Sequence, residues 1–364
     1  MTIKDITTYI ESQIPLALQE SYDNCGLIIG NPDSEIKSIL VCIDVTSEII
    51  EEAIEKGANF IISHHPLIFS GIKKLTASND IEKLVVKAIE NKIAVYALHT
   101  NADNHMRGVN ALLCAKLGIQ SSKILKPQSA GLVKLVTFCP KSCADDIRNA
   151  LFSAGAGNIG NYDSCSFNIH GEGTFKAKEG TNPYVGAIGK LHTEEETRIE
   201  TILYAHQQKK VVEALLKAHP YEEVAYDLYV LNNKNTTVGS GMIGELKEEI
   251  SAVDFLQNVK QIIGIGCIKH TEISNKKVKK IAVCGGSGSF LIKDAIAAGA
   301  DVFLTGDVKY HEYFLPENRM ILADIGHYES EQFTKELIYT LLNKKFTTFA
   351  IQISEMNTNP INYL

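Results

Sequence analysis

Short runs rich in Ile, Val and Phe alternate with amphipathic helical segments at both ends of this sequence. The strand-like runs occupy residues 38–44, 58–63, 92–100, 279–286, 301–307, 320–326 and 346–354. The helical patterns occupy residues 47–56, 81–90, 290–300 and 329–343. Such alternation predicts parallel strands joined by right-handed crossover helices. We therefore expect the two ends to build one layered α/β outer domain with mostly parallel sheets.

The middle of the chain follows a different order. Between residues 132 and 231 the pattern reads strand, helix, strand, strand, helix, strand. This βαββαβ order is that of a ferredoxin-like α+β module. The polar, turn-prone segments KPQSAG and NNKNTTVGSG flank it. We therefore expect a discontinuous outer domain of residues 1–127 and 241–364, interrupted by an inserted domain of residues 128–240.

Charge and hydropathy narrow the function classes. The 364 residues carry a net charge of -7, from 36 basic and 43 acidic side chains, which does not favour a general binder of nucleic-acid backbones. The start lacks the apolar run of a signal peptide, and no stretch reaches about 18 apolar residues. The eight cysteines form no CxxC motif and are expected to be free thiols. We expect a cytoplasmic protein without membrane or nucleic-acid partners.

Two adjacent histidines, His64 and His65, end the strand-like run before Pro66 in the segment ISHHPLIF. In open α/β sheets, ligands bind beyond the carboxyl ends of the strands. Neighbouring residues on a regular strand point to opposite faces, so adjacent histidines serve one site only where the strand has ended. The position of the pair therefore predicts a ligand-binding role.

Two other predicted strand ends carry residues of the same kind. His327 and Glu331 lie four residues apart at the start of a helix, so their side chains share one face. Asp103 follows His99 in the segment ALHTNADNHMRG, again after a strand. Imidazole and carboxylate groups together suit zinc, iron, manganese, nickel or cobalt.

Five candidate ligands emerge: His64, His65, Asp103, His327 and Glu331. A catalytic zinc normally takes three protein ligands and keeps one position open, so five donors exceed what one ion needs. Two metals about 3.5–4 Å apart accommodate the five, each taking one histidine of the pair. The sequence therefore predicts two divalent metal ions per chain.

Plainer interpretations exist for each residue. A single histidine at a strand end is more often a hydrogen-bonded structural residue than a ligand. His327 and Glu331 also fit an ordinary surface pair worth a few tenths of a kcal/mol. His99, Asp307 and His311 compete for the site, and we assign them to supporting or substrate-facing positions because metal-bound imidazoles need partners for their other nitrogen.

The segment CGGSGSF, residues 284–290, lies between a predicted strand and a predicted helix. Free backbone N–H groups in such a turn hold anions in some proteins. The spacing lacks the third glycine of a dinucleotide fingerprint, and no GK[ST] follows. A tight strand-to-helix turn is an equally good interpretation.

Several motifs together carry a family resemblance. They are SYDNCGLIIG, ISHHPLIF, HTNAD, VGSGMIGEL, CGGSGS, TGDVKYHE and GHYESE. In this order they resemble the GTP cyclohydrolase 1 type 2 homologues, also called NGG-interacting-factor-like proteins, over nearly the whole outer domain. The inserted module resembles the PII-like, CutA-like module of the longer bacterial members.

The resemblance implies a two-metal site built from the HHP, HTxxD and GHxxxE motifs. In this chain those motifs place the ligands at His64, His65, Asp103, His327 and Glu331. The resemblance also implies a hexameric ring whose metal sites face an internal cavity. The activity it implies is hydrolytic opening of the guanine imidazole ring of GTP with loss of formate.

The residues themselves indicate a reaction class rather than a substrate, because no guanine-reading motif is present. We expect a di-metal-dependent hydrolase acting on a small molecule, a nucleotide or phosphoester. Asp103 or Glu331 would bridge the metals, and His99 or His311 would transfer protons as the catalytic acid or base. The alternative is a non-enzymatic metal-binding or regulatory ring whose inserted module senses a small molecule.

Overall fold

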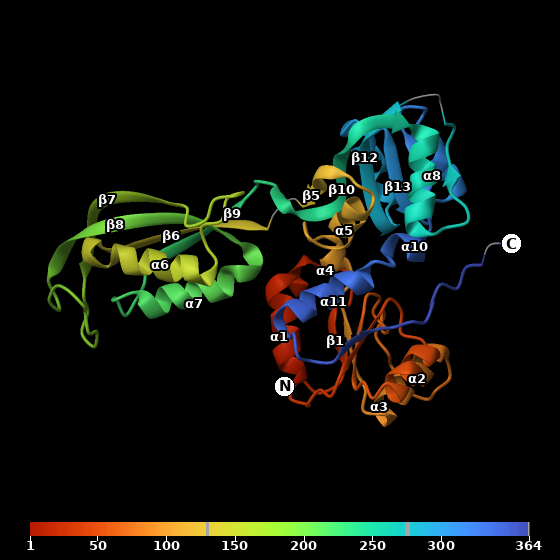
Figure 1. Cartoon of the computed structure of the whole chain (residues 1–364). Helices are drawn as coiled ribbons and strands as arrows, with labels where there is room; N and C mark the ends of the chain where they lie inside the picture. The colour runs from red at the N-terminus through yellow and green to blue at the C-terminus, as the bar shows by residue number, and fades with distance from the viewer. Residues whose placement is uncertain (129–130, 274–276, 363) are drawn as a thin grey trace. The chain divides into compact units, whose positions relative to one another are not determined.

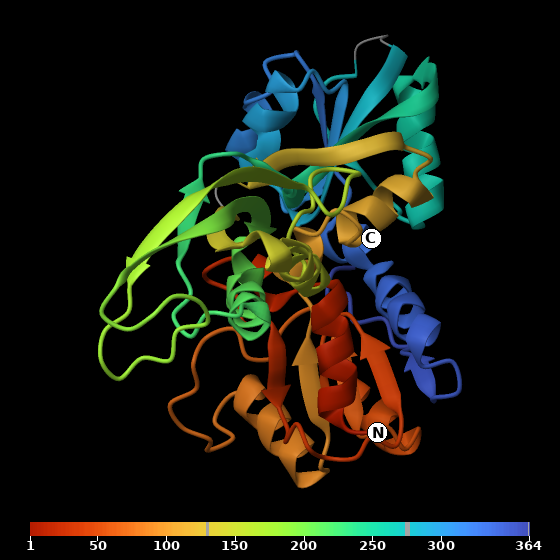
Figure 2. The same cartoon turned by 90° about the vertical axis from the view of Figure 1, so that its left-hand side faces the viewer.

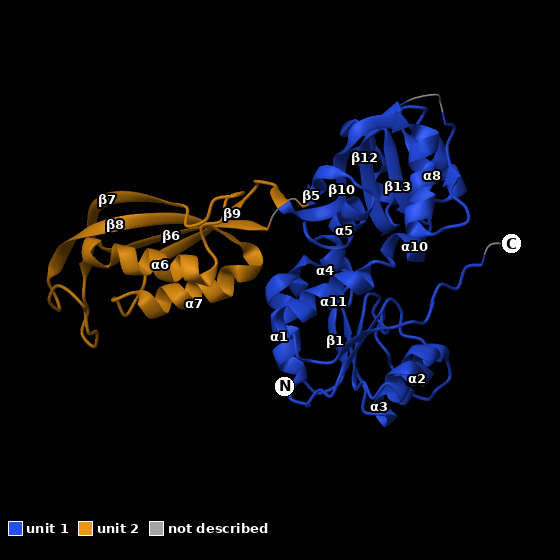
Figure 3. Cartoon of the chain, viewed as in Figure 1, with its two compact units in different colours: residues 1–127, 237–364 blue, residues 128–236 orange. Residues whose placement is uncertain are grey.

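The computed structural model describes residues 1–128, 131–273, 277–362 and 364. The chain forms two compact units, which Figure 3 colours separately. Unit 1 combines residues 1–127 with residues 237–364, and unit 2 comprises residues 128–236. Residues 237–240, which were predicted to end the inserted domain, lie in unit 1.

The first sheet of unit 1 has five strands. Their order is β1 (Gly26–Ile29), β4 (Ala94–Ala97), β3 (Phe60–Ser63), β2 (Ile39–Cys42) and β15 (Ile351–Ile353). All neighbours are parallel except β1, which runs antiparallel to β4. Every residue of β2, β3 and β4 is buried. Such complete burial is typical of parallel strands that are covered on both faces.

Helices cover both faces of this sheet (Figures 1 and 2). They are α1 (Ile3–Gln13) and α11 (Thr334–Lys345) on one face, and α2 (Ser47–Glu55) and α3 (Asp80–Glu90) on the other. Successive strand residues serve opposite faces: Ile62 packs with the α1 and α11 side, and Ile61 packs with the α2 and α3 side.

The second sheet of unit 1 has six strands. Their order is β11 (Lys269–His270), β14 (Ile321–Asp324), β13 (Val302–Gly306), β12 (Lys277–Ser287), β10 (Asn235–Ser251) and β5 (Gln120–Gln128). The central β12, β13 and β14 are parallel, while β10 and β11 pair antiparallel to their neighbours β12 and β14. The parallel strands therefore point their carboxyl ends toward one edge of the sheet.

Helices α5 (Val109–Lys116) and α8 (Ala252–Ile263) pack on one face of the second sheet, and α9 (Ile292–Ala297) packs on the other. Phe255 of α8 belongs to the hydrophobic core between the sheet and helices α5 and α8. Phe303 of β13 belongs to the core on the opposite face, under α9. Short helical turns follow several strands. They are η1 (Leu16–Leu18), α4 (Thr100–Asp103), η4 (Ser289–Leu291), η5 (Tyr310–Phe314) and α10 (His327–Glu331).

Unit 2 has the predicted βαββαβ order. Its elements are β6 (Leu132–Pro140), η2 (Lys141–Cys143), α6 (Ala144–Ala154), β7 (Ser166–Lys176), β8 (Leu191–Tyr204), η3 (Ala205–Gln207), α7 (Gln208–Ala218) and β9 (Tyr226–Leu231). The sheet order is β7-β8-β6-β9, and every pair is antiparallel. This is the ferredoxin-like order. Leu151 and Leu215 of the two helices pack on Leu135 and Ile199 of the sheet.

The expected fold class is confirmed, with layered α/β sheets in unit 1 and a ferredoxin-like order in unit 2. One strand differs from its expected length: β8 begins at Leu191 rather than near residue 198. Its polar first half pairs with β7, for example Glu194 with Gly173, and lacks the apolar alternation that would have marked it as a strand.

All eight cysteines are free thiols. Within the described residues, none of the helices is long and apolar enough to cross a membrane.

Candidate metal centre

Strand ends from both sheets of unit 1 supply the candidate ligands. His64 and His65 directly follow β3, and Asp103 ends the short helix α4 after β4. His327 and Glu331 begin and end α10, which follows β14 of the second sheet. Side chains beyond the carboxyl ends of parallel strands in two separate sheets therefore meet at one place, where α/β folds place their ligands.

The histidine pair is anchored to both neighbours of β3. The Nδ1 atom of His64 lies 2.8 Å from the carbonyl oxygen of Leu98, beyond β4. The Nδ1 atom of His65 lies 2.7 Å from Oδ1 of Asp44, beyond β2. The two rings are tilted by 40° with centroids 4.9 Å apart. Because a carbonyl oxygen only accepts hydrogen bonds, Nδ1 of His64 carries a proton, so Nε2 is the atom that offers a lone pair to a metal ion whenever the ring is neutral.

Glu331 lies at the centre of the cluster. Its Oε2 atom is 3.0 Å from Nε2 of His65, 3.2 Å from Nε2 of His327 and 3.6 Å from Nε2 of His64. The Glu331 side chain is only 3% exposed. One carboxylate thus lies between three imidazoles, with its charge almost wholly shielded from solvent.

Two buried atoms of the cluster lack hydrogen-bond partners among the described residues. They are Nε2 of His64 and Oδ1 of Asp103, which lie 3.8 Å apart. Leaving buried polar atoms unpaired costs about 1–3 kcal/mol each. Both atoms are ligand types for a divalent cation, so a metal ion placed there would satisfy both of them.

Among the residues that the structure describes, three groups of side chains are close enough to hold a metal ion. Two of them together contain the five predicted ligands: His65, His327 and Glu331 form one group, and His64, Asp103 and Glu331 form the other. Glu331 is the only residue that these two groups share. In the third group, the pair His64 and His65 is joined by His99.

Carboxylates orient the imidazoles of the cluster. Asp307 Oδ2 lies 2.7 Å from Nδ1 of His327, which places Asp307 in the supporting position predicted for it. Asp44 holds His65, and Asp23 Oδ1 holds Nδ1 of His99 at 2.8 Å. Such partners fix the ring orientation and raise ligand basicity.

Asp44 and Asp23 were not among the residues predicted to support the site. Asp44 ends the run SILVCID, so it stands just beyond β2, beside the strand that carries the histidine pair. Its position at the end of a predicted strand was the sequence feature that could have identified Asp44 as part of the site. Asp23 lies 76 residues from His99 in a segment between elements, and no local pattern connects the two.

The glycines at the end of β12 make room for Glu331. Gly286 has a φ of +61°, and a Cβ atom there would collide with Oε1 of Glu331. The Gly286 N–H donates to Oγ of Ser330, and the Gly288 N–H donates to Oγ1 of Thr305. Because side chains of the protein already accept from these groups, the tight-turn interpretation fits better than an anion site.

The electrostatics of the cluster favour positive charge around one carboxylate. Burial opposes ionisation of Glu331, but the charge of a protonated His64 and hydrogen bonds from His327 and His65 outweigh it and hold the pKa of Glu331 well below its usual range. Burial raises the pKa of Asp103 to about 6, although His64 acts against it. Protons and a metal cation would therefore compete for this cluster.

His311 is placed differently from the other candidates. It lies exposed in η5, and its ring contacts Tyr310 with centroids 5.2 Å apart. Among the described residues, the metal-compatible groups include His99 but do not include His311.

Comparisons with known proteins agree with the motif resemblance. A Halalkalibacterium halodurans protein named GTP cyclohydrolase 1 type 2 homolog is 39% identical over 358 residues, covering 96% of this chain and 95% of the relative. A Bacillus subtilis protein of the same name is 37% identical and covers 99% of this chain and 98% of the relative.

Solved structures with similar folds include relatives of the same kind. A Bacillus cereus protein related to NIF3 superposes with a TM-score of 0.88 at 39% identity, covering 100% of this chain and 99% of that one. A Staphylococcus aureus protein superposes with a TM-score of 0.79 at 31% identity and the same coverage. The family described as Duf34/NIF3 (NGG1p interacting factor 3) matches residues 1–360. The chain therefore belongs to the Duf34/NIF3 family.

Proposed function

We propose that this chain is a di-metal-dependent hydrolase that acts on a nucleotide or another phosphoester, in the manner suggested by the name GTP cyclohydrolase 1 type 2 homolog of its relatives. One observation carries the proposal. The two ligand groups formed by the five predicted residues meet at Glu331 and each take one histidine of the pair. A carboxylate has two oxygens and can span two cations, whereas an imidazole normally gives one nitrogen to one ion.

The residues fit divalent metals of the borderline type. Among the described residues, the donor set combines imidazole nitrogen with carboxylate oxygen and includes no thiolate. Such sets suit zinc, iron, manganese, nickel or cobalt. When bound, two such ions would lower the pKa of a water molecule and neutralise charge that develops on the substrate.

The remaining side chains orient groups and move protons. Asp44 and Asp307 keep the rings of His65 and His327 turned toward Glu331. His99 lies beside both histidines of the pair, with ring centroids 5.3 Å from each. Because Asp23 holds Nδ1 of His99, the Nε2 atom of that ring is the one that would accept and return a proton.

His99 suits proton transfer better than His311. Its side chain is 16% exposed, so the ring connects the buried cluster with solvent. A general base must lie within hydrogen-bond reach of the reacting groups. His311, exposed in η5, lies outside the metal-compatible groups of the described residues and stays the second candidate for this role.

Two exposed aromatic side chains next to His99 favour a substrate with a flat ring. The Phe69 ring lies 6.3 Å from the His99 ring and 6.2 Å from the Tyr22 ring. Tyr22 is 63% exposed and Phe69 is 48% exposed. Aromatic faces left open to solvent stack on nucleobases, and such stacking is worth about 1–3 kcal/mol per base.

Turnover by the metal-loaded protein tests the proposal. Purified chain is supplied in turn with each of the five candidate metals and assayed for formate and phosphate release from nucleotides and phosphoesters. We expect Asp103→Ala to abolish turnover, because it removes one ligand of a metal group, while Asp33→Ala, an exposed surface change, leaves turnover intact. Absence of turnover with every metal and substrate would contradict the hydrolase proposal.

A non-enzymatic regulatory ring is the second candidate. In that case the inserted unit would act as a PII-like or CutA-like sensor, and the metals would be structural. Both candidates share the proposal that the chain assembles with itself into a cytoplasmic hexamer, with a mass near six times the 40.0 kDa of one chain. Light scattering on the purified protein measures that mass, and a monomer would exclude the ring.

A further inference from the structure

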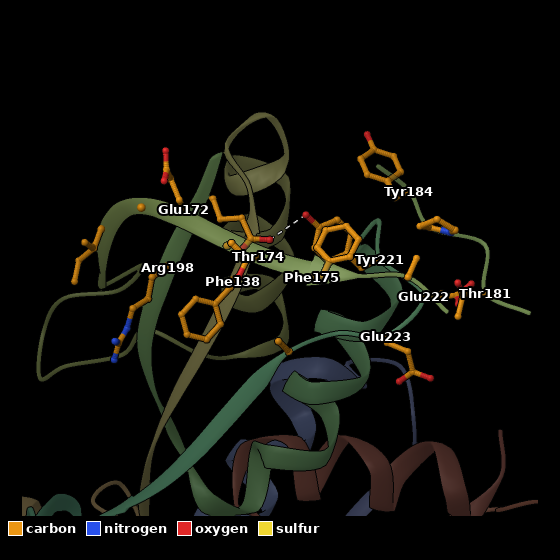
Figure 4. A pocket seen from close by; sticks show the side chains of 17 residues that line it. Phe138, Glu172, Thr174, Phe175, Thr181, Tyr184, Arg198, Tyr221, Glu222 and Glu223 are labelled. Carbon is orange, nitrogen blue, oxygen red and sulfur yellow. Dashed lines mark hydrogen bonds between the residues drawn. The ribbon is translucent and has the colours of Figure 1, made fainter. Parts of the chain in front are cut away.

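Unit 2 contains a cavity that is separate in sequence from every candidate metal ligand. Its volume is about 610 Å³. Its strand residues include Phe138 of β6 and Arg198 of β8, while their neighbours Cys139 and Ile199 point into the helix-covered core. Since strand side chains alternate between faces, the cavity lies on the face of the sheet opposite α6 and α7 (Figure 4).

The floor of this cavity is bare backbone at Gly171. Ile169, Gly171, Gly173 and Phe175 alternate along β7, and all four line the cavity. Glycine weakens a strand interior, and it often marks a place where a ligand approaches the backbone closely. A Cβ atom built on Gly171 would meet no described atom within 4 Å, so packing does not require glycine there.

A carboxylate lies beside this floor. A Cβ atom on Gly173 would collide with the carboxylate of Glu196, so the glycine lets that side chain extend over β7. Tyr221 donates its hydroxyl hydrogen to Oε1 of Glu196 at 3.0 Å, drawn as a dashed line in Figure 4. Glu196 is therefore held in place by a hydrogen bond at the edge of an open, flat surface.

The charges around the cavity are unbalanced. Four carboxylates line it, those of Glu172, Glu196, Glu222 and Glu223. Among the described lining residues Arg198 is the one cation, and it already pairs with Glu200 at 2.8 Å. The field in the cavity is negative, so it attracts cations and disfavours phosphates and carboxylates.

Aromatic rings supply the rest of the lining. The Tyr221 ring lies 6.1 Å from the Phe175 ring and 6.2 Å from the Tyr184 ring, and Figure 4 shows all three on one side of the cavity. Aromatic faces attract organic cations through their quadrupoles. The volume lies within the range of about 300–1,000 Å³ that small-molecule sites occupy.

We propose that this cavity binds a planar organic cation, such as a protonated nitrogen heterocycle or an amidine. The flat ring lies on the open backbone at Gly171, between Ile169 and the Glu196 carboxylate that extends over Gly173. Its N–H groups donate to the carboxylate of Glu196. This inference does not rest on the hydrolase proposal, because all of these residues belong to unit 2.

Titration calorimetry on the full chain with benzamidine as the probe tests this site. Benzoate is the matched anion with the same ring. We expect benzamidine to bind and benzoate not to bind, and we expect Glu196→Gln to weaken benzamidine binding at least tenfold. Glu195→Gln removes the same charge one residue earlier, at a position that does not line the cavity, and should leave the affinity unchanged.

Gly171→Val separates binding from folding. The site has room for a side chain, and valine favours strands, so the unfolding temperature should not fall. The side chain would cover the flat floor and lower benzamidine affinity at least tenfold. Lack of benzamidine binding to the wild-type chain, equal binding of benzoate, or unchanged affinity in Gly171→Val would each overturn the proposal.

Discussion

Replacing Asp44 by asparagine tests whether the carboxylates behind the imidazoles tune metal affinity. The asparagine side chain would still offer an oxygen to Nδ1 of His65, which now lies 2.7 Å from Asp44 Oδ1, but without the negative charge. Loss of such a partner typically costs 10–100-fold in metal affinity. The Asp44 side chain is 33% exposed, so solvent screens part of its charge and the lower half of this range applies.

We therefore expect Asp44→Asn to weaken one metal site about tenfold to thirtyfold, which is ~1.4–2.0 kcal/mol. The affected ion should be the one held by His65, His327 and Glu331, because Asp44 contacts His65 alone among the ligands. Calorimetric titration of metal-free protein with zinc measures both affinities.

Glu48→Gln is the matched control, because it removes an exposed carboxylate four residues away in α2. If Asp44→Asn keeps both affinities within threefold of wild type, or if Glu48→Gln weakens binding equally, the carboxylate does not act through His65.

Two glycine-to-alanine changes, one glutamate substitution and one deletion test how the site and its surroundings are stabilised. Gly286→Ala should lower the free energy of unfolding, measured in urea, by more than Gly57→Ala does. Both glycines have a positive φ, which costs a residue with a side chain roughly 1–2 kcal/mol. Only at Gly286 would the new Cβ atom also collide with Glu331. Glu82 accepts hydrogen bonds from the backbone N–H groups and side chains of the residues before α3, which lower its pKa to about 2. The stabilisation by ionised Glu82 is therefore complete above the pKa of about 4.3 that this group has in the unfolded chain, and it declines as pH falls toward 2. The urea midpoint of Glu82→Gln should lie below that of the wild type at pH 5, and the difference between the two midpoints should be smaller at pH 3. Replacing residues 128–236 by a short Gly/Ser linker should leave a folded chain that binds as much metal as wild type, measured by metal analysis, because every candidate ligand lies in unit 1; an insoluble or metal-free product would contradict this.

The clustering of the five predicted ligands was predictable because parallel strands collect functional residues at their carboxyl ends. His64, His65 and Asp103 could be assigned from the ends of apolar runs, and His327 with Glu331 from their spacing on a helix. What holds these residues in place was harder to predict. Pairs such as Asp23 with His99 are far apart in the chain, and tertiary packing alone brings them together.

Strands were predictable where their own sequence pattern is apolar and were missed where only pairing with a neighbouring strand defines them. The strand from Leu132 to Pro140 was predicted with its observed bounds, because apolar residues dominate it and a proline ends it. The first half of β8, from Leu191 to Glu196, is polar and solvent-facing, so only its pairing with β7 defines it as a strand. The role of Gly286 could not be predicted, because the collision that it avoids involves a residue from another element.

Glu331 belongs to both metal-compatible groups, so its substitution should affect both ions. Anomalous diffraction from zinc-loaded crystals of the wild type, His64→Ala, His65→Ala and Glu331→Gln measures the occupancy of each ion. We expect two ions per wild-type chain. His64→Ala and His65→Ala should each lose mainly one ion, and the lost ion should differ between the two variants. Glu331→Gln should reduce the occupancy of both ions. If Glu331→Gln retains both ions at wild-type occupancy, the bridging role is excluded and Asp103 becomes the remaining carboxylate candidate.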